Sequence, residues 1–139
     1  MLVAAERNRA DAVVPVRLSR APAEALPFPD AQFDSALATL VFCSVHDPER
    51  GLSEIWRVLK AGGSLLLLEH VRAQGKLAAW IQDVLVPFTT RCLANCHWNR
   101  ATERMVLETG FQITQILQLS GGLQPMLLIQ ATRPATLPK

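Results

Sequence analysis

The stretch that decides the fold is residues 33–71, FDSALATLVFCSVHDPERGLSEIWRVLKAGGSLLLLEHV. It contains two short apolar runs, at 33–42 and 64–71, with an amphipathic segment between them. Nearly continuous runs of this length are typical of strands that are buried on both faces. Two such strands joined by a helix form a βαβ unit, in which the strands are parallel and the crossover is right-handed. The sequence therefore predicts an α/β fold.

The segment between the two runs has the start, the stripe and the end of a helix. Asp47 can cap its N-terminus, and Pro48 suits its first turn. Apolar residues recur at i, i+3, i+4 and i+7 and make one stripe, formed by Leu52, Ile55, Trp56 and Leu59. Arg57 and Lys60 lie near the C-terminus, where the helix dipole favours cations. We expect one of the glycines at 62–63 to take the left-handed conformation that stops the helix.

The other predicted elements flank this unit. In chain order they are a short helix within 1–11, an irregular edge strand at Val13–Val16, a loop at 19–29, a helix from about Leu77, a helix from Asn99 to Thr109, and strands at 111–119 and 126–131. Gly110 is expected to stop the last helix, and the two final strands to pair antiparallel at the sheet edge. The prediction is one domain with a mostly parallel sheet, an antiparallel C-terminal hairpin and a frayed tail at 134–139.

Composition narrows the class of protein. The chain has 139 residues, enough for one domain, and it is half hydrophobic, as globular proteins are. A formal net charge of +2, with no basic run, argues against nucleic-acid binding. Three cysteines and no secretory signal favour reduced thiols and a cytoplasmic location. No apolar run approaches the length of about 20 residues that a transmembrane helix needs.

Several motifs resemble those of a known family. The string Leu26-Pro27-Phe28-Pro29-Asp30, followed by Phe33-Asp34 and later by Gly62-Gly63, resembles the middle of class I S-adenosylmethionine-dependent methyltransferases of the small-molecule type. The strings at 41–45 and 69–71 are similar to a narrower branch that methylates thiols. The resemblance implies a partial Rossmann-like fold, S-adenosylmethionine as cofactor with S-adenosylhomocysteine as product, and a small-molecule acceptor, with a thiol favoured.

The resemblance also implies residues that bind the cofactor. Ala23, Glu24 and Leu26 match the stretch that passes beside the adenine ring, and an Asp that often precedes it in the family is replaced by Pro22. We expect backbone groups and apolar contact from Ala23 and Leu26 to take its place. Three residues of the next loop match the stretch that runs past the methionine end of the cofactor: Val41, Phe42 and Cys43.

Three residues are predicted to take part in catalysis. Methyl transfer is an in-line displacement, so alignment of acceptor, methyl carbon and sulfur is its main requirement. A thiol acceptor ionises readily, whereas an oxygen acceptor needs a general base, for which His46 and His70 are candidates. Glu69 ends a buried strand at the ligand side of the sheet and is the third candidate. The alternative for each histidine is an ordinary polar residue at the end of a strand or loop.

No metal site is predicted. Cys92, Cys96 and His97 have the spacing C-x3-C-H with no second ligand pair, and a structural zinc site needs four ligands. We interpret these cysteines as helix-packing thiols near the acceptor pocket. Trp80, Phe88 and Trp98 are interpreted in the same way, as core or as wall of that pocket.

One half of the expected cofactor site has no match in the sequence. The first glycine of the chain is Gly51, so no glycine-rich turn precedes the Leu-Pro-Phe string. We therefore expect an N-terminally truncated domain that lacks its first two strands, with impaired methyl transfer. Their absence leaves the edge of a buried strand open, and such an edge is a template for pairing. The alternative function is a non-catalytic module that pairs through this edge with itself, as a homodimer, or with a separate N-terminal half.

Overall fold

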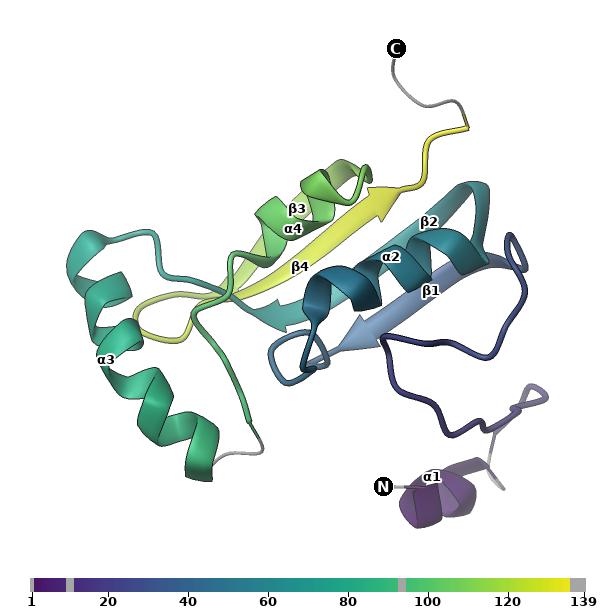
Figure 1. The fold of residues 1–139 in the computed structure, drawn as a ribbon, viewed down its shortest axis with the longest axis horizontal. Coiled ribbons are helices and arrows are strands. Elements are labelled where there is room, and N and C mark those ends of the chain that lie inside the picture. Colours follow the sequence, from purple (N-terminus) through teal and green to yellow (C-terminus); the bar gives the residue numbers. More distant parts are fainter. Residues whose placement is uncertain (1, 10–11, 93–94, 136–139) are drawn as a thin grey trace.

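A mixed sheet with helices on one side forms the frame of the molecule, in a computed structural model that describes residues 2–9, 12–92 and 95–135 (Figure 1). The elements are α1 (Leu2–Arg9), β1 (Phe33–Thr39), α2 (Pro48–Val58), β2 (Leu59–His70), α3 (Lys76–Cys92), α4 (Thr102–Glu108), β3 (Gln112–Ser120) and β4 (Met126–Thr132). Within the described part of the chain, no helix is both long and apolar enough to cross a membrane.

The sheet has the strand order β1-β2-β4-β3. β1 and β2 are parallel and are joined through α2, which confirms the βαβ unit. β4 pairs antiparallel with β2 on one side and with β3 on the other, which confirms the C-terminal hairpin. The α/β fold class is therefore confirmed, but the sheet is mixed, with one parallel pairing and two antiparallel ones, instead of mostly parallel.

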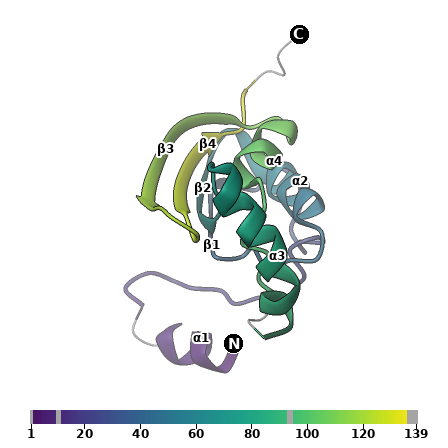
Figure 2. The same cartoon turned by 90° about the vertical axis from the view of Figure 1, so that its left-hand side faces the viewer.

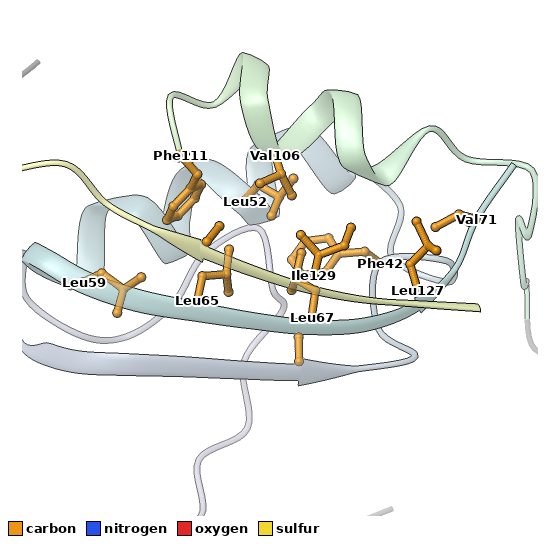
Figure 3. Close-up of a cluster of buried hydrophobic side chains, with 12 residues drawn as sticks. Phe42, Leu52, Leu59, Leu65, Leu67, Val71, Val106, Phe111, Leu127 and Ile129 are labelled. Atoms are coloured by element: carbon orange, nitrogen blue, oxygen red, sulfur yellow. The ribbon is translucent and has the colours of Figure 1, made fainter. Parts of the chain in front are cut away.

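The core lies between the sheet and two helices. α2 and α4 contact each other, and they pack on β2 and β3 respectively. Figure 3 shows the buried side chains between the helices and the sheet. The buried cluster takes side chains from both helices, from three strands and from the loops beside them: Ala38, Phe42, Leu52, Leu59, Leu65, Leu67, Val71, Val106, Phe111, Leu127, Ile129 and Ala131. Alternate residues of β2 point into this cluster, as the period of two in a strand requires.

The opposite face of the sheet carries no helix in the described part of the chain (Figure 2). Leu37 of β1 lies 69% exposed there, beside its partner Leu66 of β2. The prediction that residues 33–42 are buried on both faces is therefore wrong for this face. β1 is also the outer strand of the sheet, so its second edge is open among the described residues, as the sequence predicts.

The start of α2 agrees with the prediction and its end does not. The carboxylate of Asp47 accepts a hydrogen bond from the backbone N–H of Arg50 at 3.0 Å, and Pro48 is the first helical residue. The helix ends at Val58, and Leu59 is already extended. Gly62, with a φ of 81°, lies at an irregular point inside β2, where it permits the change of register between β1 and β2 instead of stopping the helix.

Arg133 joins the end of β4 to the crossover between α2 and β2. Its guanidinium donates to the carbonyl oxygens of Trp56 and Leu59 and lies over the Trp56 ring, 5.1 Å from the centroid. Its backbone N–H donates to the carbonyl of Gly63, and its own carbonyl accepts from Gly62. These contacts satisfy carbonyl groups that the end of α2 leaves without helical partners.

Several predictions outside the βαβ unit need correction. Val13–Val16 is not a strand; it is short, contains Pro15 and has no pairing strand among the described residues, and Val13 is fully exposed. α4 begins after Ala101, not at Asn99, although Gly110 does stop it, with a φ of 105°. On α3, Trp80 and Phe88 are exposed instead of buried, whereas Trp98 is buried as predicted. The predicted tail falls mostly on residues 136–139, outside the described residues.

Candidate functional site

Glu69 fixes the loop that follows β1. Its side chain is fully buried at the end of β2, and its carboxylate accepts three backbone hydrogen bonds. The N–H groups of Val41 and Phe42 donate to Oε1 at 2.7 and 2.9 Å, and that of Cys43 donates to Oε2 at 3.2 Å. Both oxygens are thus engaged by the loop at the carboxyl end of β1, where an open α/β sheet binds its ligands.

The segment after α3 lies along the other side of this loop. The backbone N–H of His97 donates to the carbonyl of Cys43 at 2.6 Å, and the side-chain amide of Asn95 donates to the carbonyl of Ser44 at 3.3 Å. Arg100 donates to the carbonyl of Phe42, and its burial lowers the pKa of the guanidinium. Residues 95–100 therefore hold the loop from the side opposite Glu69.

Glu24 links the predicted adenine stretch to the same loop. Its carboxylate accepts hydrogen bonds from the backbone N–H groups of His46 and Asp47, both at 3.1 Å. The hydrogen bond from Asp47 is the main reason that the pKa of Glu24 is lowered. The Arg50 guanidinium adds a bond to the Glu24 carbonyl at 3.1 Å. The side chain of Glu24 therefore contacts the protein's own backbone beside the start of α2.

An ion pair on α2 shapes the Leu-Pro-Phe string. The Glu54 carboxylate accepts from the backbone N–H of Leu26 at 2.7 Å, and Arg57 donates to the carbonyls of Leu26 and Phe28 at 3.1 and 2.8 Å. The hydrogen bond from Arg57 also holds the pKa of Glu54 at about 2. Because Glu54 takes the Leu26 N–H, that group is not available to an adenine ring.

Gly51 lets the adenine stretch and the β1 loop approach each other. A Cβ atom built on Gly51 lies 3.1 Å from Cε1 of Phe42 and 3.6 Å from the Cβ of Ala23. Both residues were predicted to bind the cofactor, and they meet at this backbone position of α2. Phe42 is buried in the core, so its ring is not available to a ligand.

The predicted catalytic residues are only partly brought together. His70 has a ring nitrogen within 4.8 Å of the Cys43 and Cys96 sulfur atoms, at the carboxyl end of β2. Burial raises the pKa of the Cys43 thiol to about 12. The side chain of His46 is exposed on the loop before α2. His46 therefore lies on the outer side of the loop whose inner side Glu69 holds.

Some of the residues that build this site escaped the prediction. Arg100, Glu54 and Arg57 act through hydrogen bonds to backbone groups 28 or more residues away in sequence. Such long-range bonds leave no spacing pattern in one sequence. The available signal was local: Glu54 and Arg57 lie three residues apart on a helix, where opposite charges pair.

A cavity of about 550 Å³ lies on another side of the β2 carboxyl end. Its walls come from the segment after β2, from α4 and from the β3–β4 hairpin, and they include Arg72, Thr102, Arg104 and Leu127. None of the predicted cofactor-binding or catalytic residues lines it. It is therefore separate from the loop that Glu69 holds.

Comparison with known proteins agrees with this architecture. Residues 1–67 match the family described as "Methyltransferase domain". The chain is 32% identical over 126 residues to a ubiquinone/menaquinone biosynthesis C-methyltransferase, UbiE, of Marinomonas sp. (strain MWYL1), covering 78% of this chain and 50% of that protein. It is 39% identical over 88 residues to the thiol S-methyltransferase TMT1B of Rattus norvegicus, covering 63% of this chain and 36% of that protein.

The fold has solved counterparts as well. The crystal structure of a SAM-dependent methyltransferase from Aquifex aeolicus superposes with a TM-score of 0.63 at 16% identity, over 94% of this chain and 61% of that one. The homologues and the structural neighbours of the chain are SAM-dependent methyltransferases. The chain spans about half the length of the UbiE protein and about a third of the TMT1B protein.

S-adenosylmethionine is the methyl donor of class I methyltransferases, and the residues described here fit one side of it. Ala23, beside Gly51, and the loop at 41–43 offer an apolar wall and a backbone that is already fixed. The other side needs a glycine-rich turn after a strand, and residues 12–32 contain neither a glycine nor a strand. The fit is therefore partial and is confined to the side formed by β1, β2 and α2.

Proposed function

We propose that the protein transfers a methyl group from S-adenosylmethionine to a small-molecule acceptor, and that the acceptor is a thiol. The observation that carries the proposal is the loop at 41–43, which Glu69 and residues 95–100 fix at the carboxyl end of β1. A fixed loop at this place suits a reaction that depends on alignment. The thiol is favoured by the similarity to TMT1B, which extends over 88 residues at 39% identity.

Every predicted residue except Glu24, whose carboxylate holds the backbone of His46 and Asp47, has a role in this proposal. Ala23 and Leu26 form the wall beside the adenine, and the loop of Val41, Phe42 and Cys43, whose N–H groups Glu69 already holds, forms a fixed wall beside the methionine portion. Glu69 is a positioning residue instead of an acid or base, because both of its oxygens already accept backbone hydrogen bonds. A thiol acceptor needs no strong base. His46 and His70 take the role of base only for an oxygen acceptor.

The acceptor class is tested in the longest form of the protein that binds S-adenosylmethionine. Equal concentrations of an aliphatic thiol, a phenol and a primary amine are compared for methylation by mass spectrometry. The proposal expects transfer to the thiol to be fastest and to survive His46→Gln. Faster methylation of the phenol, with loss in His46→Gln or His70→Gln, would show that the acceptor is an oxygen.

We also propose that the 139 residues by themselves bind S-adenosylmethionine weakly. This rests on the one-sided fit, because a ligand held on one side makes only part of its contacts. Calorimetric titration of the 139-residue chain is the test, with Ala23→Asp as a variant in the wall beside the adenine. Micromolar affinity of the unmodified chain, lowered by Ala23→Asp, would refute the proposed impairment while supporting the adenine side of the site.

One observation favours a second function, a module that pairs through its sheet. The outer edge of β1 has no partner among the described residues, and the helix-free face beside it exposes Leu37. Unpaired strand edges are ready templates for association with another chain. Sedimentation velocity tests this function: a dimer that Leu37→Lys and Ser35→Pro dissociate supports pairing through β1, and a monomer at all concentrations refutes self-pairing.

We propose the cytoplasm as the place of action. The support is that Cys43 and Cys96 are both free although their sulfur atoms lie within 4.8 Å of each other. Close thiols that stay unpaired are typical of reducing compartments. Fractionation of cells that express a tagged protein tests this location, and recovery in a membrane fraction after salt washing would contradict it.

A further inference from the structure

Three side chains that are far apart in sequence meet at the carboxyl ends of β1 and β2. They are Cys43 on the loop after β1, His70 at the end of β2, and Cys96 on the segment after α3. The two sulfur atoms and a ring nitrogen of His70 all lie within 4.8 Å of one another. We propose that this cluster is a zinc site, with two thiolate ligands, one imidazole ligand and a fourth position open to water or to an added ligand.

The distances suit a tetrahedral ion. With Zn–S bonds of about 2.3 Å and Zn–N bonds of about 2.0–2.1 Å, tetrahedral geometry places the ligand atoms roughly 3.5–3.8 Å apart. The separations of up to 4.8 Å in the metal-free cluster therefore need to shorten by about 1.3 Å at most. Side-chain torsions supply a shift of this size, because Cys96 and His70 are only partly buried.

The imidazole supplies a second, independent observation. Nδ1 of His70 is buried and has no hydrogen-bond partner within the described part of the chain. A buried polar nitrogen without a partner carries a cost that a metal bond removes, either by direct ligation or by fixing the tautomer. Such an atom beside two free thiols indicates a missing ligand, which a zinc ion supplies.

The backbone around the cluster is already in place. The His97 N–H donates to the carbonyl of Cys43 at 2.6 Å, so the two segments that carry the cysteines are joined at this point. Glu69 accepts the Cys43 N–H at 3.2 Å, which joins the loop to the strand that carries His70. Three hydrogen-bonded segments thus present the ligands, and binding of the ion requires no large rearrangement.

The charges at the site also balance. Two thiolates neutralise one divalent ion, and the charges of Glu69 and Arg100, which bond to the N–H and the carbonyl of Phe42 respectively, sum to zero. A buried site with zero net charge avoids the cost of an unpaired charge. Soft thiolates together with an imidazole favour zinc over magnesium or calcium, which prefer oxygen ligands.

This site differs from the one that the sequence offered and that we rejected. Cys92, Cys96 and His97 are neighbours in the chain, whereas the new cluster takes only Cys96 from that segment. The two sets share Cys96, so they make opposite predictions only for variants of the other residues, which are Cys43 and His70 in one set and Cys92 and His97 in the other. The proposal does not rest on methyl transfer, because zinc binding is measured without S-adenosylmethionine.

The experiment is a titration of the reduced 139-residue chain with Co²⁺, followed by competition with Zn²⁺. We expect one Co²⁺ per chain, the intense visible bands of a tetrahedral ion, and a thiolate charge-transfer band that Zn²⁺ removes. Removal of the groups that hydrogen-bond to metal ligands lowers metal affinity about 10–100-fold. Cys96→Ser and His70→Gln remove the ligands themselves, so they should lower the affinity by at least that much. Cys92→Ser and His97→Gln should leave both the spectrum and the affinity unchanged.

Three results would overturn the proposal. One is the absence of a charge-transfer band in the unmodified chain, and another is loss of the band in Cys92→Ser or His97→Gln but not in His70→Gln. The third is a Cys43–Cys96 disulfide, found by mass spectrometry in protein purified without reductant, together with a failure of the reduced protein to take up metal. Far-ultraviolet circular dichroism of each variant separates loss of binding from loss of fold, and the partly exposed Cys96 makes Cys96→Ser the variant least able to disturb folding.

Discussion

Removal of the Glu69 carboxylate is expected to loosen the loop after β1 and to lower the stability of the whole domain. In Glu69→Ala the N–H groups of Phe42 and Cys43 lose their acceptor, and both residues are almost completely buried. A buried backbone group without a partner costs about 1–3 kcal/mol. Two such groups cost about 2–6 kcal/mol, and the Val41 N–H, which is partly exposed, can recover a bond to water.

Glu69→Gln gives a graded comparison. Its amide oxygen can replace Oε1 and accept the bonds from Val41 and Phe42, whereas its NH₂ group then faces the N–H of Cys43, donor against donor. One orphaned donor and the loss of the charge predict a destabilisation of about 1–3 kcal/mol, smaller than that of Glu69→Ala. Domains are stable by only about 5–15 kcal/mol, so both effects are measurable.

Urea unfolding followed by circular dichroism measures these free energies, and hydrogen exchange of residues 41–43 locates the change. The matched control is Glu108→Gln, because that carboxylate is exposed and pairs only with the Arg104 side chain among the described residues. We expect the control to match the unmodified protein. A loss below about 1 kcal/mol in Glu69→Ala, the lower bound for one orphaned buried group, would refute the reasoning.

Three further predictions concern other parts of the fold. The folded protein lowers the pKa of Glu54 from its ordinary value of 4.5 to about 2, so the stabilising effect of the carboxylate is complete above pH 4.5 and is lost as the pH falls toward 2. Glu54→Gln should therefore flatten the fall in the free energy of unfolding between these two pH values. An unchanged fall would contradict this prediction. Gly110→Ala should lower the free energy of unfolding, measured in urea, by about 1–2 kcal/mol, because the φ of Gly110 is 105° and an added Cβ atom lies 3.3 Å from the Trp56 ring. The control Gly121→Ala, at a position without a positive φ, should leave the free energy of unfolding nearly unchanged. Trp80 is 61% exposed, whereas Trp98 is only 7% exposed. Trp80→Phe should therefore remove most of the fluorescence that acrylamide quenches, and Trp98→Phe should leave that fraction unchanged. If Trp98→Phe removes the quenched fluorescence and Trp80→Phe does not, α3 packs against the core.

The parts of the fold that sequence predicts well are those with local causes. Asp47 and Pro48 start α2 because a cap and a fixed φ act within one turn, and the apolar stripe of α2 faces the core because its period is helical. Val13–Val16 shows the limit of local signals. Its composition suits a strand, but a strand exists only with a partner, and pairing cannot be read from one segment.

The site is less predictable than the fold for a related reason. Glu69 was found because it ends a buried strand, but its bond to Phe42 joins residues 27 positions apart, and that contact changes its expected role from catalysis to positioning. Arg100 reaches Phe42 across 58 positions. The cluster of Cys43, His70 and Cys96 comes from three segments, so no spacing in the sequence indicates it, and the set that spacing does offer, Cys92, Cys96 and His97, is not predicted to bind a metal.

The contacts of Arg133 have a consequence for the order in which the chain folds during synthesis. The βαβ unit occupies residues 33–70, yet the carbonyl groups at the end of α2 and the Trp56 ring find their partner in a residue more than 70 positions later. Until Arg133 has left the ribosome, the junction between α2 and β2 lacks this clamp, and β2 lacks β4. The unit that defines the fold is therefore synthesised early and stabilised late, and chaperones have their main opportunity to bind it in that interval.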